Sequence, residues 1–66
     1  MKVTYDPHTD SLSIFLKEGS KVAESEEDRA GVILDYDETG QLIAIEILDA
    51  SKRVSDARRI EYQWMD

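Results

Sequence analysis

The sequence contains no cysteine, only one proline, and three glycines that stand singly among its 66 residues. Without cysteine, neither a disulfide nor a thiolate metal site can reinforce the fold. A domain of this length buries only ~60% of the surface that its unfolded chain exposes. Natural domains below ~70–80 residues often gain the missing stability by oligomerising. We therefore expect a single small domain over residues 1–66, with a thin core, that forms a homodimer.

Long apolar runs are also missing. No segment approaches the ~20 apolar residues that a membrane span needs. The first residues, MKVTYD, do not begin the apolar run of a secretory signal peptide. The absence of cysteine agrees with a reducing compartment. These observations predict a cytoplasmic protein that does not contact membranes.

Basic residues are few: the chain has 15 acidic and 8 basic side chains, and its formal net charge is −7. Such a field repels phosphate backbones and attracts basic surfaces. Lys52, Arg53, Arg58 and Arg59 lie close together in the sequence, and we interpret them as a solvated or cap-neutralising helix face. We expect basic proteins as partners and no direct contact with nucleic acid.

Alternation of apolar and polar residues predicts the first strands. Met1, Val3 and Tyr5 alternate with polar side chains, and the same alternation resumes over residues 12–16. Residues 6–10, DPHTD, separate the two segments; proline presets φ in a turn, and aspartate bonds forward to backbone amides. The pattern indicates two strands joined by a turn.

Residues 31–50, GVILDYDETGQLIAIEILDA, have the outline of a β-hairpin, because two apolar runs flank a short polar loop that contains Gly40. The second run, over residues 42–48, is apolar on both faces and is interrupted only by Glu46. A strand of this kind belongs in the middle of a sheet. We expect the C-terminal segment to cover one of its faces, and other side chains or a second copy to cover the other.

Residues 21–28 contain little apolar material and four acidic side chains, which predicts a short edge strand. Acidic residues on an edge oppose unwanted sheet pairing, and the alternative interpretation is a docking surface for a basic partner. In the C-terminal segment, Val54, Ala57, Ile60 and Trp64 recur at helical spacing and predict an amphipathic helix on the sheet. The alternative is a final strand over residues 59–64, which are rich in aromatic and β-branched side chains.

The predicted fold class is therefore α+β. A small antiparallel sheet of about four strands, connected by hairpins as a meander, occupies residues 1–49. A C-terminal helix or tail occupies residues 50–66. The sequence has no cysteine nucleophile, no glycine-framed serine and no phosphate-binding glycine loop, so we expect neither catalytic residues nor a cofactor, and no enzyme.

Residues 35–46, DYDETGQLIAIE, match the spacing of a calcium loop, with Asp35, Asp37, Thr39 and Glu46 at ligand positions. The flanking segments alternate and are β-branched, which is typical of strands. A strand would carry Glu46 several rises of ~3.3 Å from the loop, where it cannot complete the site. We therefore assign no metal ligand and keep divalent-cation binding as the alternative function.

A second cluster, Asp6, His8 and Asp10, lies on the predicted first turn. One imidazole and two carboxylates could hold a divalent ion. Turns favour aspartate for its bonds to the backbone, and this is the interpretation that we adopt.

The runs YDP at residues 5–7, GVILDYD at residues 31–37 and IEILDAS at residues 45–51 together resemble the small prokaryotic domain-of-unknown-function family 2283. The resemblance covers residues 1–53, and it departs from the family at Ala44, where glycine is usual. It implies a small β-rich fold without an assigned activity, found in bacteria. By analogy with genes that lie beside small presumed toxins, it also implies an antitoxin-like role.

We therefore hypothesise a small acidic protein-interaction module that binds a small basic protein. The side chains predicted to meet lysines or arginines of that partner are Glu24, Glu26, Glu27, Asp28, Asp35 and Asp37.

Overall fold

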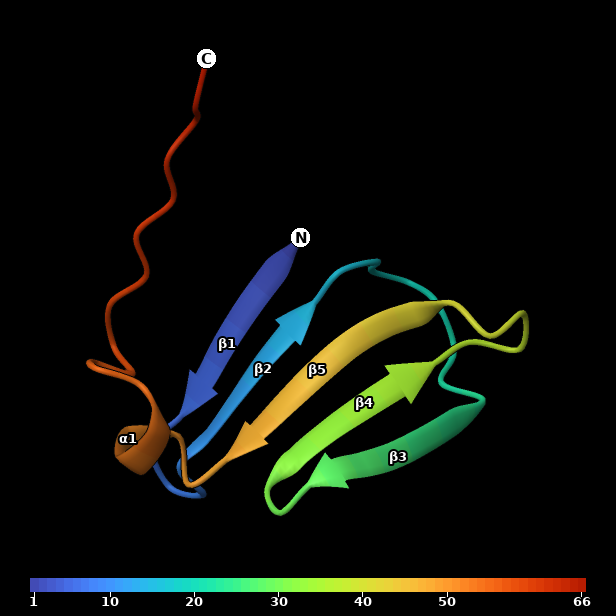
Figure 1. The fold of residues 1–66 in the computed structure, drawn as a ribbon, viewed down its shortest axis with the longest axis horizontal. Helices are drawn as coiled ribbons and strands as arrows, with labels where there is room; N and C mark the ends of the chain where they lie inside the picture. Colours follow the sequence, from blue (N-terminus) through green and yellow to red (C-terminus); the bar gives the residue numbers. More distant parts are fainter.

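The computed structural model describes all residues from 1 to 66. Five strands form one antiparallel sheet, in the order β1-β2-β5-β4-β3 (Figure 1). The strands are β1 (Lys2–Asp6), β2 (Ser11–Phe15), β3 (Glu24–Arg29), β4 (Val32–Tyr36) and β5 (Leu42–Leu48), followed by the short helix α1 (Ala50–Arg53). None of the structure has the helical length and apolarity that a membrane crossing requires.

The predicted antiparallel sheet is confirmed, but its strand count and connectivity differ from the prediction. Five strands are present where about four were expected. β3, β4 and β5 follow one another as a meander, whereas β5 then lies beside β2. Because β5 is apolar on both faces, it takes the central position, with the β1–β2 hairpin on one side and β4 and β3 on the other.

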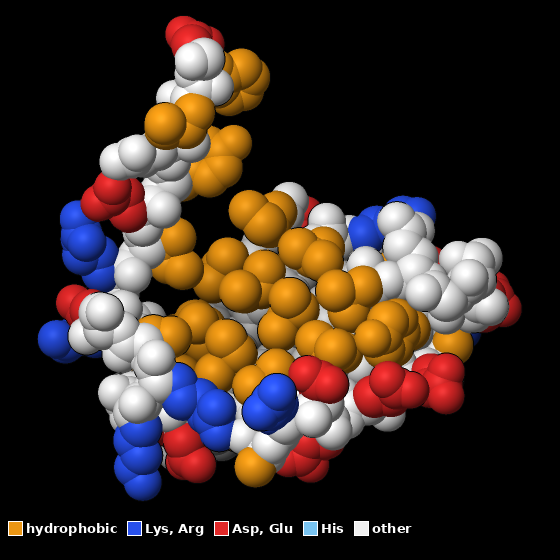
Figure 2. Space-filling model, in the orientation of Figure 1, with side chains coloured by type: hydrophobic (Ala, Val, Ile, Leu, Met, Phe, Trp, Pro, Cys, Tyr) orange, Lys and Arg blue, Asp and Glu red, His pale blue; other side chains and the backbone are white.

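One face of the sheet is apolar. Cross-strand partners share a face, so the strand registers define two rows of neighbouring side chains that cross four strands. The first row is Val3, Ile14, Ile45 and Leu34, and the second is Tyr5, Leu12, Ile47 and Val32. We call these eight residues the apolar face. Figure 2 shows apolar side chains spread across β1, β2, β5 and β4 on the face turned to the viewer.

No second layer covers this apolar face. Within it only Leu12 is buried; the other buried apolar residues of the chain are Ile43, Ala44 and Ala50. No large side chain is fully buried anywhere in the protein. The sheet therefore has the patterning of a layered domain but lacks the layer that would complete its core.

Asp10 ties the first turn to the C-terminal helix. Its Oδ1 accepts hydrogen bonds from the Tyr5 hydroxyl at 2.8 Å and the Ser51 amide at 3.0 Å, and its Oδ2 accepts one from Ser51 Oγ at 2.6 Å. Its carbonyl accepts the Ala50 amide at 3.0 Å. These bonds, above all that from the Ser51 hydroxyl, hold the pKa of Asp10 below its ordinary value. Asp10 has a φ of 53°, in the left-handed region that aspartate tolerates.

Arg53, at the end of α1, fixes the helix to the β3–β4 turn. Its guanidinium donates to the carbonyl of Ala30, and its Nε donates to the carbonyl of Leu48 at 3.1 Å. The guanidinium lies so close to Gly31 that a Cβ at that position would be 2.8 Å from Nη2. Asp10 and Arg53 therefore hold α1 against two separate turns at one end of the sheet.

The sequence predicts a helix or tail over residues 50–66: a short helix is present over Ala50–Arg53, and the amphipathic helix expected over residues 54–64 is not formed. Regular helix ends at Arg53, and the carboxylate of Asp56 then accepts the Arg58 amide at 3.0 Å while its carbonyl accepts the Arg59 amide at 3.2 Å. This local turn competes with helical hydrogen bonding. The following residues run past β1 without joining the sheet (Figure 1). Of the side chains predicted to pack, Ile60 and Trp64 are exposed, and Val54 and Ala57 are half-buried.

We expect Asp10→Asn to lower the thermal midpoint of unfolding at pH 7, because an amide cannot replace a carboxylate that accepts three hydrogen bonds. The folded pKa of Asp10 lies below its ordinary value of 3.8. The stabilisation is therefore present above that value and disappears as the pH falls through the lower folded pKa. Melting curves followed by circular dichroism between pH 2 and pH 7 measure both effects.

Asp49→Asn is the matched control, since Asp49 has the same φ of 53° but makes no side-chain capping bond. Equal midpoints for the two variants at pH 7 would contradict the assigned role of Asp10.

Candidate functional site

The sheet face opposite the apolar face carries a pair of acidic side chains near its centre. Asp35 lies opposite Ala44, and Glu46 lies opposite Ile33, so the register of β4 and β5 makes Asp35 and Glu46 diagonal neighbours on one face. Asp35 is buried, with 4% of its surface exposed. Its Oδ1 accepts a hydrogen bond of 2.6 Å from Ser25 Oγ, across the β3–β4 pair.

The two carboxyl groups interact directly. A hydrogen bond with Asp35 raises the pKa of Glu46 above its ordinary value, and burial and repulsion by the Asp35 charge act in the same direction. A shared proton relieves the repulsion between two like charges at close range. The Asp35–Glu46 pair is thus a site where one proton binds more tightly in the folded protein than in the unfolded chain.

The expectation that Glu46 would lie away from the acidic loop residues is wrong for Asp35. Extension of β5 does carry Glu46 away from the loop, but β4 runs beside β5, and Asp35 belongs to β4 rather than to the loop. Glu46 is distant from Asp35 along the chain, but antiparallel pairing of β4 with β5 brings the two side chains together. Ser25 was not singled out for the same reason, because its position opposite Asp35 depends on the β3–β4 register.

The remaining predicted calcium ligands are engaged within the loop. Oδ1 of Asp37 accepts hydrogen bonds from the Thr39 amide at 2.9 Å, the Thr39 hydroxyl at 2.7 Å and the Gln41 amide at 3.0 Å. The Thr39 hydroxyl is the largest cause of the lowered pKa of Asp37. The four candidate ligands therefore form two separate pairs and do not converge on one point.

The second candidate cation cluster is likewise divided. Asp6 accepts the backbone amide of His8 at 2.9 Å, whereas the Asp10 carboxylate faces Tyr5 and Ser51. No three acidic, histidine or cysteine side chains of the chain gather in a metal-binding arrangement. The first turn uses its aspartates for backbone and hydroxyl contacts.

A cleft of about 270 Å³ lies over Asp35, between the sheet and the connection from β2 to β3. Ile43 and Ala44 both line it, because a β-bulge at Ile43 lets Asp35 pair with Ala44 while Tyr36 pairs with Leu42. The other lining residues combine apolar, basic, acidic and small side chains: Lys2, Phe15, Lys17, Glu18, Gly19, Ser20 and Val22. This cover, together with the apolar neighbours Phe15, Ile43 and Ala44, explains why Asp35 is buried.

The acidic surface predicted for a basic partner is only partly assembled. All residues of β3 are exposed, and β3 is an edge strand as expected. Glu24 and Glu26 pair with Tyr36 and Leu34, so they border the apolar face. Glu27 lies on the opposite face and accepts the Gly31 amide at 2.8 Å.

Two of the six predicted contact residues lie apart from this edge. Asp35 does not belong to the surface, because its side chain is buried beneath the β2–β3 connection. Asp37 lies in the β4–β5 loop, with its carboxylate occupied by Thr39 and Gln41. The acidic edge is therefore the exposed part of β3, with Glu24, Glu26, Glu27 and Asp28.

We expect Glu46→Gln to stabilise the protein at pH 7, because a neutral amide removes the repulsion and still donates to Asp35. The raised pKa of Glu46 means that its contribution to stability is fully present below the ordinary value of 4.5 and is lost as the pH rises through the folded pKa. The advantage of the variant should therefore grow from pH 4 to pH 7 in melting experiments.

Glu26→Gln is the control for net charge, since Glu26 is exposed and lies on the other face. A pH dependence that is the same in both variants would refute a shared proton at Asp35 and Glu46.

Comparison with known proteins places the chain in a family. Residues 2–51 match the family described as "Protein of unknown function (DUF2283)". A protein of Methanosarcina mazei named "Putative hypoxanthine phosphoribosyltransferase" is 44% identical over 62 residues, which are 88% of this chain and 50% of that protein. "Uncharacterized protein MJ0789" of Methanocaldococcus jannaschii is 40% identical over 52 residues, or 79% of this chain and 43% of that protein.

The chain thus spans about half the length of the curated relatives it matches, and no solved structure matches it. The matched residues include all five strands and the first two residues of α1, so the family resemblance and the sheet coincide. The chain belongs to the DUF2283 family, whose function is unknown.

Proposed function

We propose that this chain is a cytoplasmic, non-enzymatic interaction module that associates with a second copy through its apolar face and binds a basic protein at its acidic edge. The observation that carries the proposal is the uncovered apolar face, which crosses β1, β2, β5 and β4 without a second layer (Figure 2). Seven of its eight residues are half-buried and Leu12 is buried, so the face is a contiguous, partly exposed apolar surface, which is typical of association sites in soluble proteins.

A second copy suits this face for two reasons. Two sheets that pack face to face form a sandwich core ~10 Å thick, which is the layer that a single chain lacks. The opposite face is unsuited to the same role, because the β2–β3 connection covers part of it, and because Glu46 and the neighbouring Ser13 hydroxyl would lose water there. The two faces therefore differ in a way that directs association to one of them.

We expect Ile45→Lys, at the middle of the apolar face, to weaken self-association by on the order of thirtyfold or more, as loss of a central contact residue does. Sedimentation equilibrium over a range of concentrations measures the mass. Leu48→Lys makes the same apolar-to-lysine change on the opposite face of the same strand, at an exposed side chain, and should retain the assembly of the unmodified chain.

Leu34→Lys, in the same row of the apolar face, repeats the test at a second position, with circular dichroism to verify that each variant is folded. A folded wild-type chain that sediments as a monomer at all concentrations would rule out self-association through this face.

The acidic edge supports the second part of the proposal. Glu24 and Glu26 project at the border of the apolar face, and their charges are not paired with a basic side chain, since the only ion pair of the structure joins Arg59 and Glu61. With a net charge of −7, the chain attracts cationic partners over some distance. An antitoxin-like protein that covers a basic active surface would use an edge of this type.

We expect the double variant Glu24→Lys and Glu26→Lys to bind a small basic protein encoded beside this chain on the order of tenfold more weakly, through loss of exposed ion pairs. Added salt should weaken binding by the unmodified chain, because it screens exposed charges. Titration calorimetry at two salt concentrations measures both effects.

Glu18→Lys with Glu38→Lys gives the same change of net charge away from β3 and is the matched control. Equal losses in the two double variants would show that net charge, rather than the acidic edge, governs binding.

The name of the Methanosarcina mazei relative refers to phosphoribosyl transfer, and this chain spans half of that protein. We propose an interaction role for the shared half. In this chain the three glycines lie in three separate turns with positive φ, at Gly19, Gly31 and Gly40, whereas a glycine-rich phosphate loop groups such residues before a helix.

A further inference from the structure

The residues after the Asp56 turn form an extended arm that has no partner. We call residues 59–64 the arm. The Arg59 guanidinium contacts the Glu61 carboxylate at 3.0 Å, and the Gln63 amide donates to the same carboxylate. In an extended backbone, side chains two residues apart lie on the same side, as these three do.

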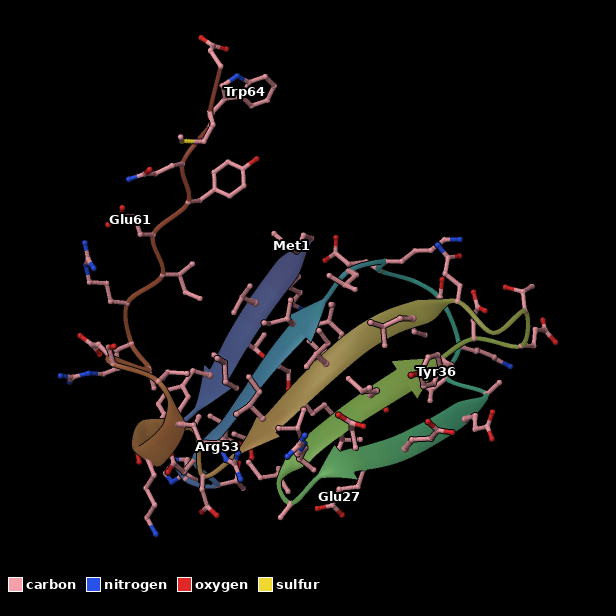
Figure 3. All side chains as sticks on the ribbon, in the orientation of Figure 1. Met1, Glu27, Tyr36, Arg53, Glu61 and Trp64 are labelled. Carbon is pink, nitrogen blue, oxygen red and sulfur yellow. The ribbon has the colours of Figure 1, made fainter.

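The alternation gives the arm two different sides. Glu61 and Trp64 point to opposite sides of the backbone in Figure 3. The apolar side carries Ile60, Tyr62 and Trp64, whose exposed fractions are 58%, 75% and 82%. Beyond the bond from the Arg59 amide, no backbone group of the arm makes a hydrogen bond to another backbone group. The side chains of the arm therefore alternate as in a strand, but its backbone has no neighbouring strand to bond with.

The sheet offers two free edges, and they are chemically different. β3 carries four acidic residues and a bulge between Glu27 and Arg29, features that oppose strand addition. β1 is regular over its whole length and pairs with β2 without a register shift. Its central residues, Val3, Thr4 and Tyr5, are uncharged and β-prone. β1 is thus the edge suited to another strand.

The base of the arm is fixed, so its direction is set. α1 is held by Asp10 and Arg53, and the Asp56 turn directs the following residues along β1 and past the N-terminus, separated from the sheet (Figure 1). In Figure 1 the arm runs opposite in direction to β1 without joining the sheet. It makes no backbone bond to its own β1.

We infer that the arm adds to the β1 edge of a second copy as a sixth antiparallel strand, and that the second copy returns the same contact. A two-fold pair in which both arms exchange leaves no arm unpaired. Placing Ile60, Tyr62 and Trp64 on the same face as Val3 and Tyr5 would extend the apolar face by one strand. This inference deepens the self-association part of the proposed function, from which it takes the second copy.

The chain contains no cysteine, so single introduced cysteines report this contact directly. In the proposed pairing, Thr4 lies on the same face as Glu61 and Gln63, and all three side chains are exposed. A mixture of Thr4→Cys and Glu61→Cys chains, and a second mixture of Thr4→Cys and Gln63→Cys chains, are oxidised and separated by mass. We expect a disulfide-linked heterodimer in at least one mixture, well above the level that each single variant gives alone.

Trp64 is the only tryptophan and provides an independent readout without any substitution. Its emission should shift to shorter wavelength as the protein concentration rises and the exposed indole enters the exchanged strand. Tyr62→Pro removes an amide donor from the arm and should abolish the shift, whereas Met65→Pro, beyond the arm, should retain it.

Three outcomes would overturn the inference. A Thr4→Cys, Glu61→Cys chain that closes on itself, with no linked heterodimer in either mixture, would show that the arm pairs with its own β1. Dimers by sedimentation without any linkage would leave face-to-face association standing and remove the arm exchange. Monomers with a constant Trp64 emission would remove both the exchange and the self-association proposed above.

Discussion

A sheet of one layer has two faces that can expose apolar surface to water. In this chain only the connection from β2 to β3 and the short helix α1 are available to cover them. The connection from β2 to β3 covers the part of the opposite face that carries Asp35, and α1 covers one end of the sheet. Apolar surface left in water costs ~25 cal/mol per Å² relative to burial. The apolar face is therefore the surface whose burial would stabilise the fold most.

The Asp35–Glu46 pair helps to fix the register of the sheet. A slip of one residue between β4 and β5 would exchange the two faces of one strand relative to the other. Asp35 or Glu46 would then lie among the isoleucines, where an unpaired charge is costly. The carboxyl pair weakens the protein through repulsion at high pH, yet it also penalises every misaligned pairing of the central hairpin. Ser25 extends this control to β3, because its hydroxyl reaches Asp35 only in the observed register.

Features that depend on the residues of a single strand could be predicted from the sequence. The residues of β5 are apolar on both faces, and this placed the strand centrally without knowledge of its neighbours. The acids of β3 likewise identified an edge. The contact of Asp35 with Glu46 could not be predicted in that way, because it depends on the pairing of two strands and on the bulge at Ile43. The C-terminal segment was ambiguous, since Ile60 and Trp64 fit both helical spacing and strand alternation; the Asp56 turn, which is local, decided against the helix.

The two edges of the sheet separate the two kinds of association that we propose. β3 combines exposed carboxylates with a bulge. These features disfavour binding of a neutral strand and favour binding of a cationic surface. β1 lacks both features, and the arm that faces solvent beside it has its charges balanced between Arg59 and Glu61. A contact at one edge leaves the other edge free, because three strands lie between them. On this proposal, charge at one edge and its absence at the other would let a single small sheet distinguish a second copy of itself from a basic partner.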